Sequence, residues 1–220
     1  MIVSYHRNFI YIRTRKTASS TIEGVLKQHL GPDDLFVGKG QIRKPRSGGR
    51  RANKTRLEAA NGEVPDDVAG HMNAAQIKSL VPDDFWNSCF KFTSERHPYE
   101  KAVSLANYNF GRLKSHGKAE GHDLSSFLDR VLESGRYRSF DLYSIDGGVV
   151  VDDFIRYESL QGDIRRICDR LGIAPPDELP RKSTAAYAIK QPAKEVLSDW
   201  QKRRIFNHCR EEFELLGYEP

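Results

Sequence analysis

The sequence predicts an α/β fold in which a single domain is built around a central parallel sheet with helices on both faces. Three observations lead to this prediction. Short aromatic and β-branched runs alternate with segments of helical apolar spacing, polar loops join a strand to the following helix, and 220 residues suit one core. In such folds ligands bind at the carboxyl ends of the strands, so the loops after the strands are the first places to look for function.

The first strand and helix lie near the N-terminus. Residues 9–13 (Phe-Ile-Tyr-Ile-Arg) are typical of a buried strand, and residues 20–30 then carry apolar side chains at helical spacing. Gly31 and Pro32 end this helix. Residues 38–56 are almost all Gly, Ser, Lys, Arg, Asn and Pro without apolar periodicity, so an exposed or mobile loop without secondary structure is predicted, basic over its last eighteen positions.

The middle of the chain repeats the same order of elements. Residues 73–80 predict a short helix, and residues 89–94 alternate as a second strand that ends at Glu95 and Arg96. Pro98 then stands where a proline opens the next helix.

The C-terminal half predicts one more strand and three helices. Residues 153–157 are the third strand, and helices are predicted over 124–135, 161–171 and 193–216. Strands that alternate with helices in this way favour parallel pairing, because a parallel connection needs a crossover.

The composition excludes several classes of protein. With 38% hydrophobic and 30% charged residues, the chain is globular, and its net charge of +5 mildly favours an anionic ligand without indicating nucleic-acid binding. Cys89, Cys168 and Cys209 are odd in number and lack metal-ligand spacing, so buried thiols are expected rather than disulfides or a zinc site. Without a long apolar run or a signal-peptide pattern, the expected location is cytoplasmic.

The first chemical signal is the run Arg-Thr-Arg-Lys-Thr-Ala-Ser-Ser-Thr at residues 13–21, where the first strand gives way to a helix. Free N–H groups at a helix start, five hydroxyl residues and three cations predict a phosphate or sulfate cradle. The alternative is a well-capped helix with a solvated basic flank, because Ser and Thr are also ordinary N-cap residues. No glycine precedes Lys16 and Thr17, so an ordinary ATP or GTP loop is not expected.

The second signal is residues 96–104, again where a strand leads into a helix. The planar guanidinium of Arg96 suits a terminal phosphate, and Ser104 follows two helical turns after Pro98. The alternative is an arginine held in a salt bridge at a helix entrance.

Together the two runs resemble the 5′-phosphosulfate loop and the 3′-phosphate motif of sulfotransferases that use PAPS (3′-phosphoadenosine 5′-phosphosulfate), especially carbohydrate sulfotransferases related to heparan sulfate 2-O-sulfotransferase. The resemblance extends to residues 154–160 and 213–218, and so over most of the chain. It implies a parallel sheet of about five strands in a P-loop-kinase-like sulfotransferase fold. The implied reaction moves a sulfuryl group from PAPS to a hydroxyl by in-line displacement.

The resemblance also implies roles for individual residues. Lys16 stabilises the leaving phosphate, and His71, between the two motifs, is the general base, with His97 as a weaker rival. The other five histidines are expected to be solvated or structural. The implied donor-binding residues are Arg13, Lys16, Thr17, Ala18, Ser19 and Ser20 at the 5′-phosphosulfate, Arg96 and Ser104 at the 3′-phosphate, and Arg181, Lys182 and Tyr187 in a covering loop.

Several alternatives stay open at this point. Residues 181–187 lack the glycine-rich form of cytosolic sulfotransferases and fit an ordinary basic loop as well. The eight Lys and Arg of residues 39–56 are either solvated or recruit an acidic glycan or an anionic lipid surface. No metal is expected, since Lys and Arg supply the cations.

The expected acceptor is a hydroxyl-bearing glycan, glycolipid or other small molecule, and no nucleic-acid partner is expected. Two other functions compete with the sulfotransferase hypothesis. One is an ATP-dependent P-loop-like kinase, and the other is a noncatalytic module that binds polyanions or nucleic acid.

Overall fold

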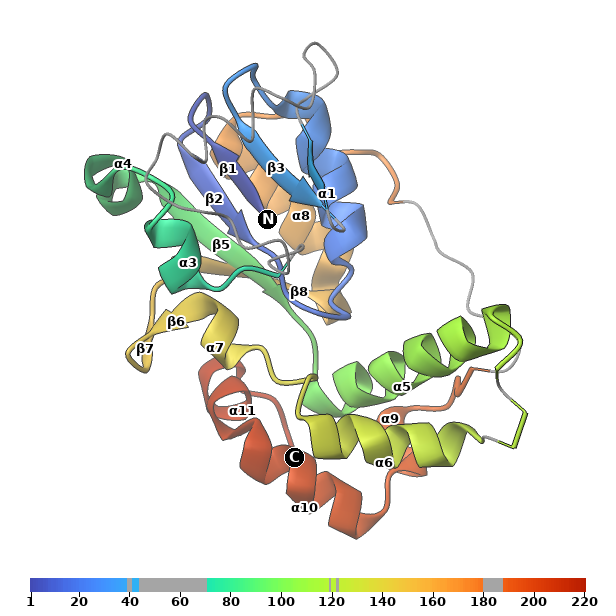
Figure 1. Ribbon diagram of the computed structural model, residues 1–220. Helices are drawn as coiled ribbons and strands as arrows, with labels where there is room; N and C mark the ends of the chain where they lie inside the picture. Colours follow the sequence, from blue (N-terminus) through green and yellow to red (C-terminus); the bar gives the residue numbers. More distant parts are fainter. Residues whose placement is uncertain (39–40, 44–70, 119, 122, 180–187) are drawn as a thin grey trace. The chain divides into compact units, whose positions relative to one another are not determined.

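The computed structural model describes residues 1–38, 41–43, 71–118, 120–121, 123–179 and 188–220 (Figure 1). The chain divides into two compact units. The first unit comprises Met1–Thr14, Ala18–Glu95 and Asp141–Leu179, and the second comprises Arg15–Thr17, Arg96–Phe140 and Pro180–Pro220. The organisation of all 220 residues as a single domain remains a prediction.

The first unit contains a mixed sheet that has six strands in the described residues, in the order β4-β3-β1-β2-β5-β8. The three predicted strands β2, β5 and β8 are its parallel half, whereas β1, β3 and β4 pair antiparallel. The prediction of an all-parallel sheet is therefore wrong for half of the strands. Short connections such as residues 5–8 between β1 and β2 allow only antiparallel pairing. The strands are β1 Ile2–Ser4, β2 Phe9–Ile12, β3 Leu35–Gly38, β4 Gln41–Arg43, β5 Phe90–Glu95 and β8 Asp153–Arg156.

Helices cover the sheet of the first unit. Phe9, Tyr11 and Phe92 point to the face on which α1 (Ser19–Leu26) and α8 (Leu160–Leu171) pack. The alternate side chains of β1 and β2 are fully buried too, so the opposite face is also covered. The remaining elements are the 3₁₀ turns Lys27–His29 and Tyr157–Ser159, α3 Ala74–Lys78, α4 Asp83–Ser88, α7 Phe140–Tyr143, and a hairpin of β6 Ser144–Ile145 and β7 Gly148–Val149.

The second unit is helical. Its core joins α5 to α6 and to the C-terminal helices through side chains such as Ala102, Phe127, Ile205 and Phe213. The single helix predicted over 193–216 is wrong, because three helices occupy that range and Ser198 begins the second with a capping box. The bounds are α5 Pro98–Ser115, α6 Leu124–Ser134, α9 Ala193–Val196, α10 Asp199–His208 and α11 Arg210–Leu216.

Part of the predicted unstructured loop is a strand. Gln41–Arg43 form β4, whose register pairs Ile42 with Val37 of β3, so the absence of secondary structure predicted over 38–56 is wrong there. Residues 39–40 and 44–56 of that loop lie outside the described residues. None of the helices in the described part of the chain has the length and apolar character needed to cross a bilayer.

Candidate functional site

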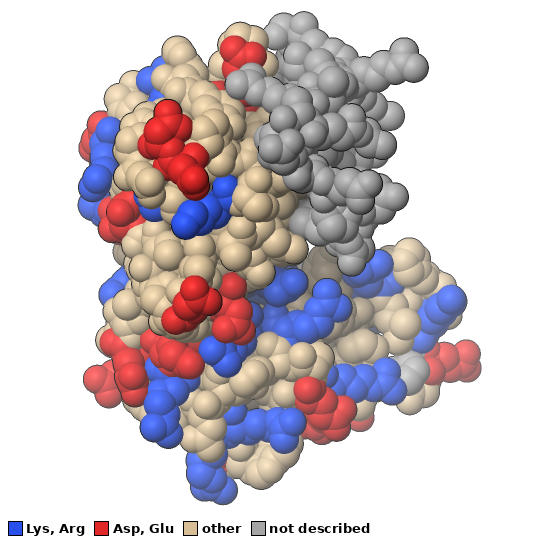
Figure 2. Space-filling view, turned by 60° about the vertical axis from the view of Figure 1, so that its left-hand side comes forward, with Lys and Arg blue, Asp and Glu red and all other residues tan. Residues whose placement is uncertain are grey.

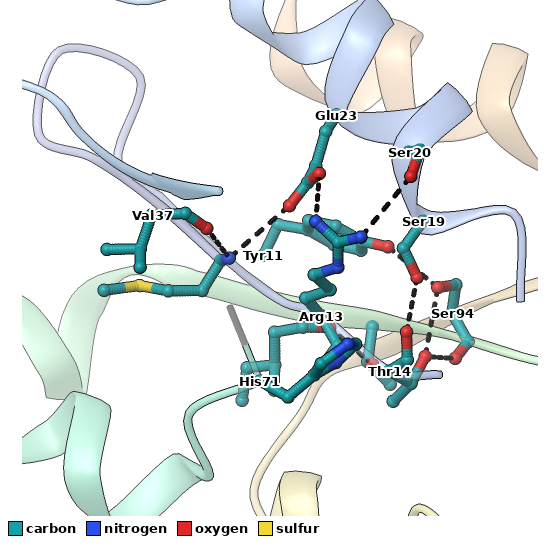
Figure 3. Close-up of polar contacts among 12 residues, drawn as sticks. Tyr11, Arg13, Thr14, Ser19, Ser20, Glu23, Val37, His71 and Ser94 are labelled. Carbon is teal, nitrogen blue, oxygen red and sulfur yellow. Dashed lines mark hydrogen bonds and ion pairs between the residues drawn. The ribbon is translucent and has the colours of Figure 1, made fainter. Parts of the chain in front are cut away.

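The predicted phosphosulfate loop leaves the carboxyl end of β2 and is tied to the end of β5 by hydroxyl groups (Figure 3). Thr14 donates its hydroxyl hydrogen bond to the carbonyl of Ser94, and the Ser94 hydroxyl lies 2.8 Å from that of Tyr11. Ser19, the first residue of α1, donates to the Thr14 carbonyl at 2.5 Å. These bonds fix both ends of the loop at the carboxyl edge of the parallel strands.

The backbone of this loop is left-handed at two residues that are not glycine. Lys16 has φ 63° and Ala18, the N-cap of α1, has φ 62°. A left-handed L-residue costs about 1–2 kcal/mol, so the surrounding bonds must hold the loop in this shape. Left-handed residues occur in backbone turns that direct N–H groups into an anion-binding concavity.

Arg13 has a structural contact that sequence reasoning missed. Its guanidinium is buried and contacts the Glu23 carboxylate of α1 at 2.6 Å, and it also donates to the Ser20 hydroxyl at 3.3 Å (Figure 3). Arg13 therefore anchors the end of β2 to α1. Its assignment to the 5′-phosphosulfate remains a prediction, and a ligand would have to share this guanidinium with Glu23.

His71, which lies two residues before the Asn73 N-cap of α3, is held in one tautomer. Its Nδ1 lies 3.2 Å from the backbone carbonyl of Arg13. A carbonyl oxygen only accepts, so Nδ1 donates its hydrogen and Nε2 is the basic nitrogen of the neutral ring. An imidazole fixed in this way is suited to accept a proton through Nε2.

The rival His97 is the N-cap of α5. Its Nδ1 accepts from the Tyr99 backbone N–H at 3.3 Å, and its Nε2 donates to the Glu219 carbonyl at 2.9 Å. Both ring nitrogens of His97 therefore make structural bonds.

In the second unit, α5 brings parts of the two predicted motifs together. Arg96 contacts Glu100 at 3.0 Å, and Ser104 and Tyr108 follow Glu100 at successive intervals of four residues, on the same side of the helix. The Lys16 ammonium lies 4.6 Å from the centre of the Tyr108 ring. Ser104 is one helical turn from Tyr108, a rise of about 6 Å.

The segment that follows the predicted covering loop is also bound to α5. Asn107 bonds both backbone groups of Ile189, accepting at 3.0 Å and donating at 3.1 Å. The Ala193 N–H donates to the second oxygen of Glu100 at 2.7 Å. Arg181, Lys182 and Tyr187 themselves lie outside the described residues.

The predicted residues fall in both units. Arg13, Ala18, Ser19, Ser20 and His71 belong to the first, and Lys16, Thr17, Arg96 and Ser104 to the second.

Arg15 is a further cation of the loop that sequence reasoning did not single out. Burial and the positive charge of Arg136 lower the pKa of its guanidinium. Among the described residues Arg15 forms no ion pair, so none of their carboxylates neutralises its positive charge.

Three further findings concern the surface charges, metal binding and similarity to known proteins. On the face drawn in Figure 2, Lys and Arg are interspersed with Asp and Glu, so the described part of that face has no field of one sign. Within the described ranges, no group of three or more His, Cys, Asp and Glu side chains is placed to hold a metal ion.

No protein-family model, curated protein or solved structure matches the chain.

Proposed function

We propose that the chain is a PAPS-dependent sulfotransferase that transfers a sulfuryl group to a hydroxyl of a carbohydrate or another small acceptor. The observation that supports this most is one side of α5. Glu100 on that side contacts Arg96, Ser104 follows one turn later, and the Lys16 ammonium lies over the ring of Tyr108. A nucleotide with phosphates at both ends needs cations from two separate motifs. Here a cation from each motif, Lys16 and Arg96, contacts a side chain of the same helix, α5.

In this proposal basic and hydroxyl side chains bind the phosphates of the donor. Arg96 and Ser104 bind the 3′-phosphate, which distinguishes PAPS from ATP, and Lys16 stabilises charge on the oxygen that leaves. The left-handed loop and the start of α1 bind the 5′-phosphosulfate through backbone N–H groups and the hydroxyls of Ser19 and Ser20. Cations from Lys and Arg take the place that magnesium has in kinases.

His71 is the proposed general base. The acceptor oxygen forms a bond to sulfur while the bond from sulfur to the leaving phosphate oxygen breaks, and the acceptor proton passes to Nε2 of His71. The bond from Nδ1 to the Arg13 carbonyl holds the hydrogen of the neutral ring on Nδ1, so Nε2 is the nitrogen that takes up the proton. A loosely bonded sulfuryl group makes positioning and electrostatics the main sources of rate acceleration.

Calorimetry with PAP, the desulfated product, tests the donor site. In EDTA, PAP should bind with micromolar or better affinity, and adenosine 5′-phosphate, which lacks the 3′-phosphate, at least tenfold more weakly, since a charge-assisted contact contributes about 1.5–3 kcal/mol. Arg96→Ala should remove this discrimination, whereas Arg165→Ala, an exposed arginine on α8, should keep it. Equal affinity for the two nucleotides, or a requirement for magnesium, would refute the proposal.

Release of PAP from PAPS in the presence of a panel of sugars and glycolipids tests the catalytic residues. His71→Ala should lower turnover about 10²–10⁴-fold with little change in PAP affinity, because a base acts only on the acceptor proton. Lys16→Ala should also lower turnover strongly, and His116→Ala should leave it unchanged. An unchanged rate in His71→Ala would exclude His71 as the base.

A further inference from the structure

A groove of about 230 Å³ lies wholly within the second unit, away from the residues assigned above. Its walls come from the first turn of α5, from α10 and from the last residue described. The lining residues are Tyr99, Asp199, Lys202, Arg203, Phe206 and Pro220. The groove is smaller than the about 300–1,000 Å³ typical of sites for drug-sized ligands, so it suits a molecule with a single ring.

Tyr99 lines the groove as a polar side chain that is almost entirely buried. It is only 2% exposed, and its ring packs against His97 and Phe213 with centroids 5.1 and 5.5 Å away. Among the described residues its hydroxyl has no hydrogen-bond partner, and its oxygen is accessible to solvent. The hydroxyl is therefore open to the groove and is available to donate a hydrogen bond to a molecule bound there.

The charges around the groove favour an anion. Lys202 and Arg203 follow one another on α10, and within the described residues neither forms an ion pair or a side-chain hydrogen bond. A third cation, Arg210, lies 5.7 Å from the Phe206 ring, whereas Asp199 is the only acidic residue of the lining.

We propose that this groove binds a small organic anion made of one flat ring and one carboxylate or sulfate group. The anionic group contacts Lys202 and Arg203, the ring packs on Phe206, and the Tyr99 hydroxyl donates a hydrogen bond to the ligand. Burial raises the pKa of Tyr99, so the hydroxyl keeps its proton at neutral pH and can donate. A ligand here would contact the first turn of α5, three residues after Arg96.

Benzoate and phenyl sulfate are the probes, and ¹⁵N chemical shifts of the full chain are the readout. Either probe should saturate shifts of Tyr99, Lys202 and Phe206, and benzylamine, which has the same ring but a positive charge, should not. The Lys202→Ala, Arg203→Ala double variant should weaken binding more than tenfold. Tyr99→Phe removes only the hydroxyl and should weaken binding about three- to tenfold. Lys78→Ala, an exposed lysine on α3, should have no effect.

Three outcomes would overturn the proposal. These are no saturable shift of the groove residues with either probe, equal binding of benzylamine, and full affinity in the double variant. Excess PAP should leave the benzoate shifts unchanged, and displacement by PAP would mean that the groove belongs to the donor site. The proposal stands or falls independently of sulfotransferase activity, because neither PAPS nor turnover enters the binding measurement.

Discussion

Replacing Lys101 by Met tests how α5 is held in place. The Lys101 ammonium and the Glu212 carboxylate of α11 are both fully buried, with Nζ and Oε1 3.8 Å apart. The same Oε1 accepts from the backbone N–H groups of Ser139 at 2.9 Å and Phe140 at 3.2 Å, and Lys101 donates to the Ser139 hydroxyl at 3.2 Å. The pair therefore joins two helices and the segment between α6 and α7.

The magnitude follows from burial of the charge that is left behind. Lys101→Met leaves the Glu212 carboxylate inside the unit without its cation, which should lower the free energy of unfolding by about 3–5 kcal/mol. Glu212→Gln keeps an oxygen for the two N–H groups but removes the carboxylate charge that lies 3.8 Å from the Lys101 ammonium, at a similar cost of about 3–5 kcal/mol. The double variant removes both charges of this pair and should lose only about 1–3 kcal/mol, so the two losses should fall short of additivity by at least about 3 kcal/mol.

Urea unfolding followed by far-UV circular dichroism measures all four proteins of this cycle. Lys194→Met, an exposed lysine on α9 in the same unit, is the control and should change stability by less than about 0.5 kcal/mol. Additive losses in the double variant, or a loss below about 1 kcal/mol for Lys101→Met, would refute the interaction.

Three further predictions concern other parts of the fold. The Asp34 carboxylate is fully buried and accepts from one hydroxyl and two backbone N–H groups, so Asp34→Ala should lower the free energy of unfolding in urea by at least about 2 kcal/mol, and near-wild-type stability would contradict this role. Asn107→Ala should speed hydrogen exchange of the Ile189 amide about fivefold or more, whereas Asn107→Asp keeps the acceptor and should preserve protection. Burial raises the pKa of the Cys89 thiol and of the Tyr11 hydroxyl, so above about pH 8.5 the unfolded chain releases protons that the folded chain keeps. The melting temperature should therefore fall as pH rises from 8.5 to 11, and a flat profile would contradict the assignment.

The parallel half of the sheet was predictable because β2 is a buried run of aromatic and β-branched residues, β5 alternates aromatic and polar residues, and β8 has Phe154 and Ile155 at its centre. The antiparallel half was not predicted, since β1 is only three residues long and carries too little periodicity. Its pairing depends on the turn at residues 5–8, where Asn8 is left-handed. Helices were predicted where apolar spacing and a clear end coincide, as in α8 before Gly172. The C-terminal helix was predicted as continuous because apolar spacing runs through the capping box at Ser198.

The candidate site was predictable only as far as local chemistry shows it. Hydroxyl and basic residues between a strand and a helix indicated an anion site from composition alone. The contact of Lys16 with Tyr108 joins residues far apart in the chain, and so does the bond from Asn107 to Ile189. Such pairs depend on how α5 packs within its unit, which no sequence periodicity records. The pairing of Arg13 with Glu23 was missed for a similar reason, because it requires the shape of the intervening loop.

Hydrogen exchange of the unmodified chain in EDTA, with and without PAP, tests the central claim most directly. One nucleotide bound by the loop and by α5 should slow exchange in two separate stretches, residues 13–21 and 96–108, at the same PAP concentration. Adenosine 5′-phosphate should protect the second stretch much less, because it lacks the phosphate assigned to Arg96 and Ser104. Protection confined to one stretch, or equal protection by both nucleotides, would contradict the claim.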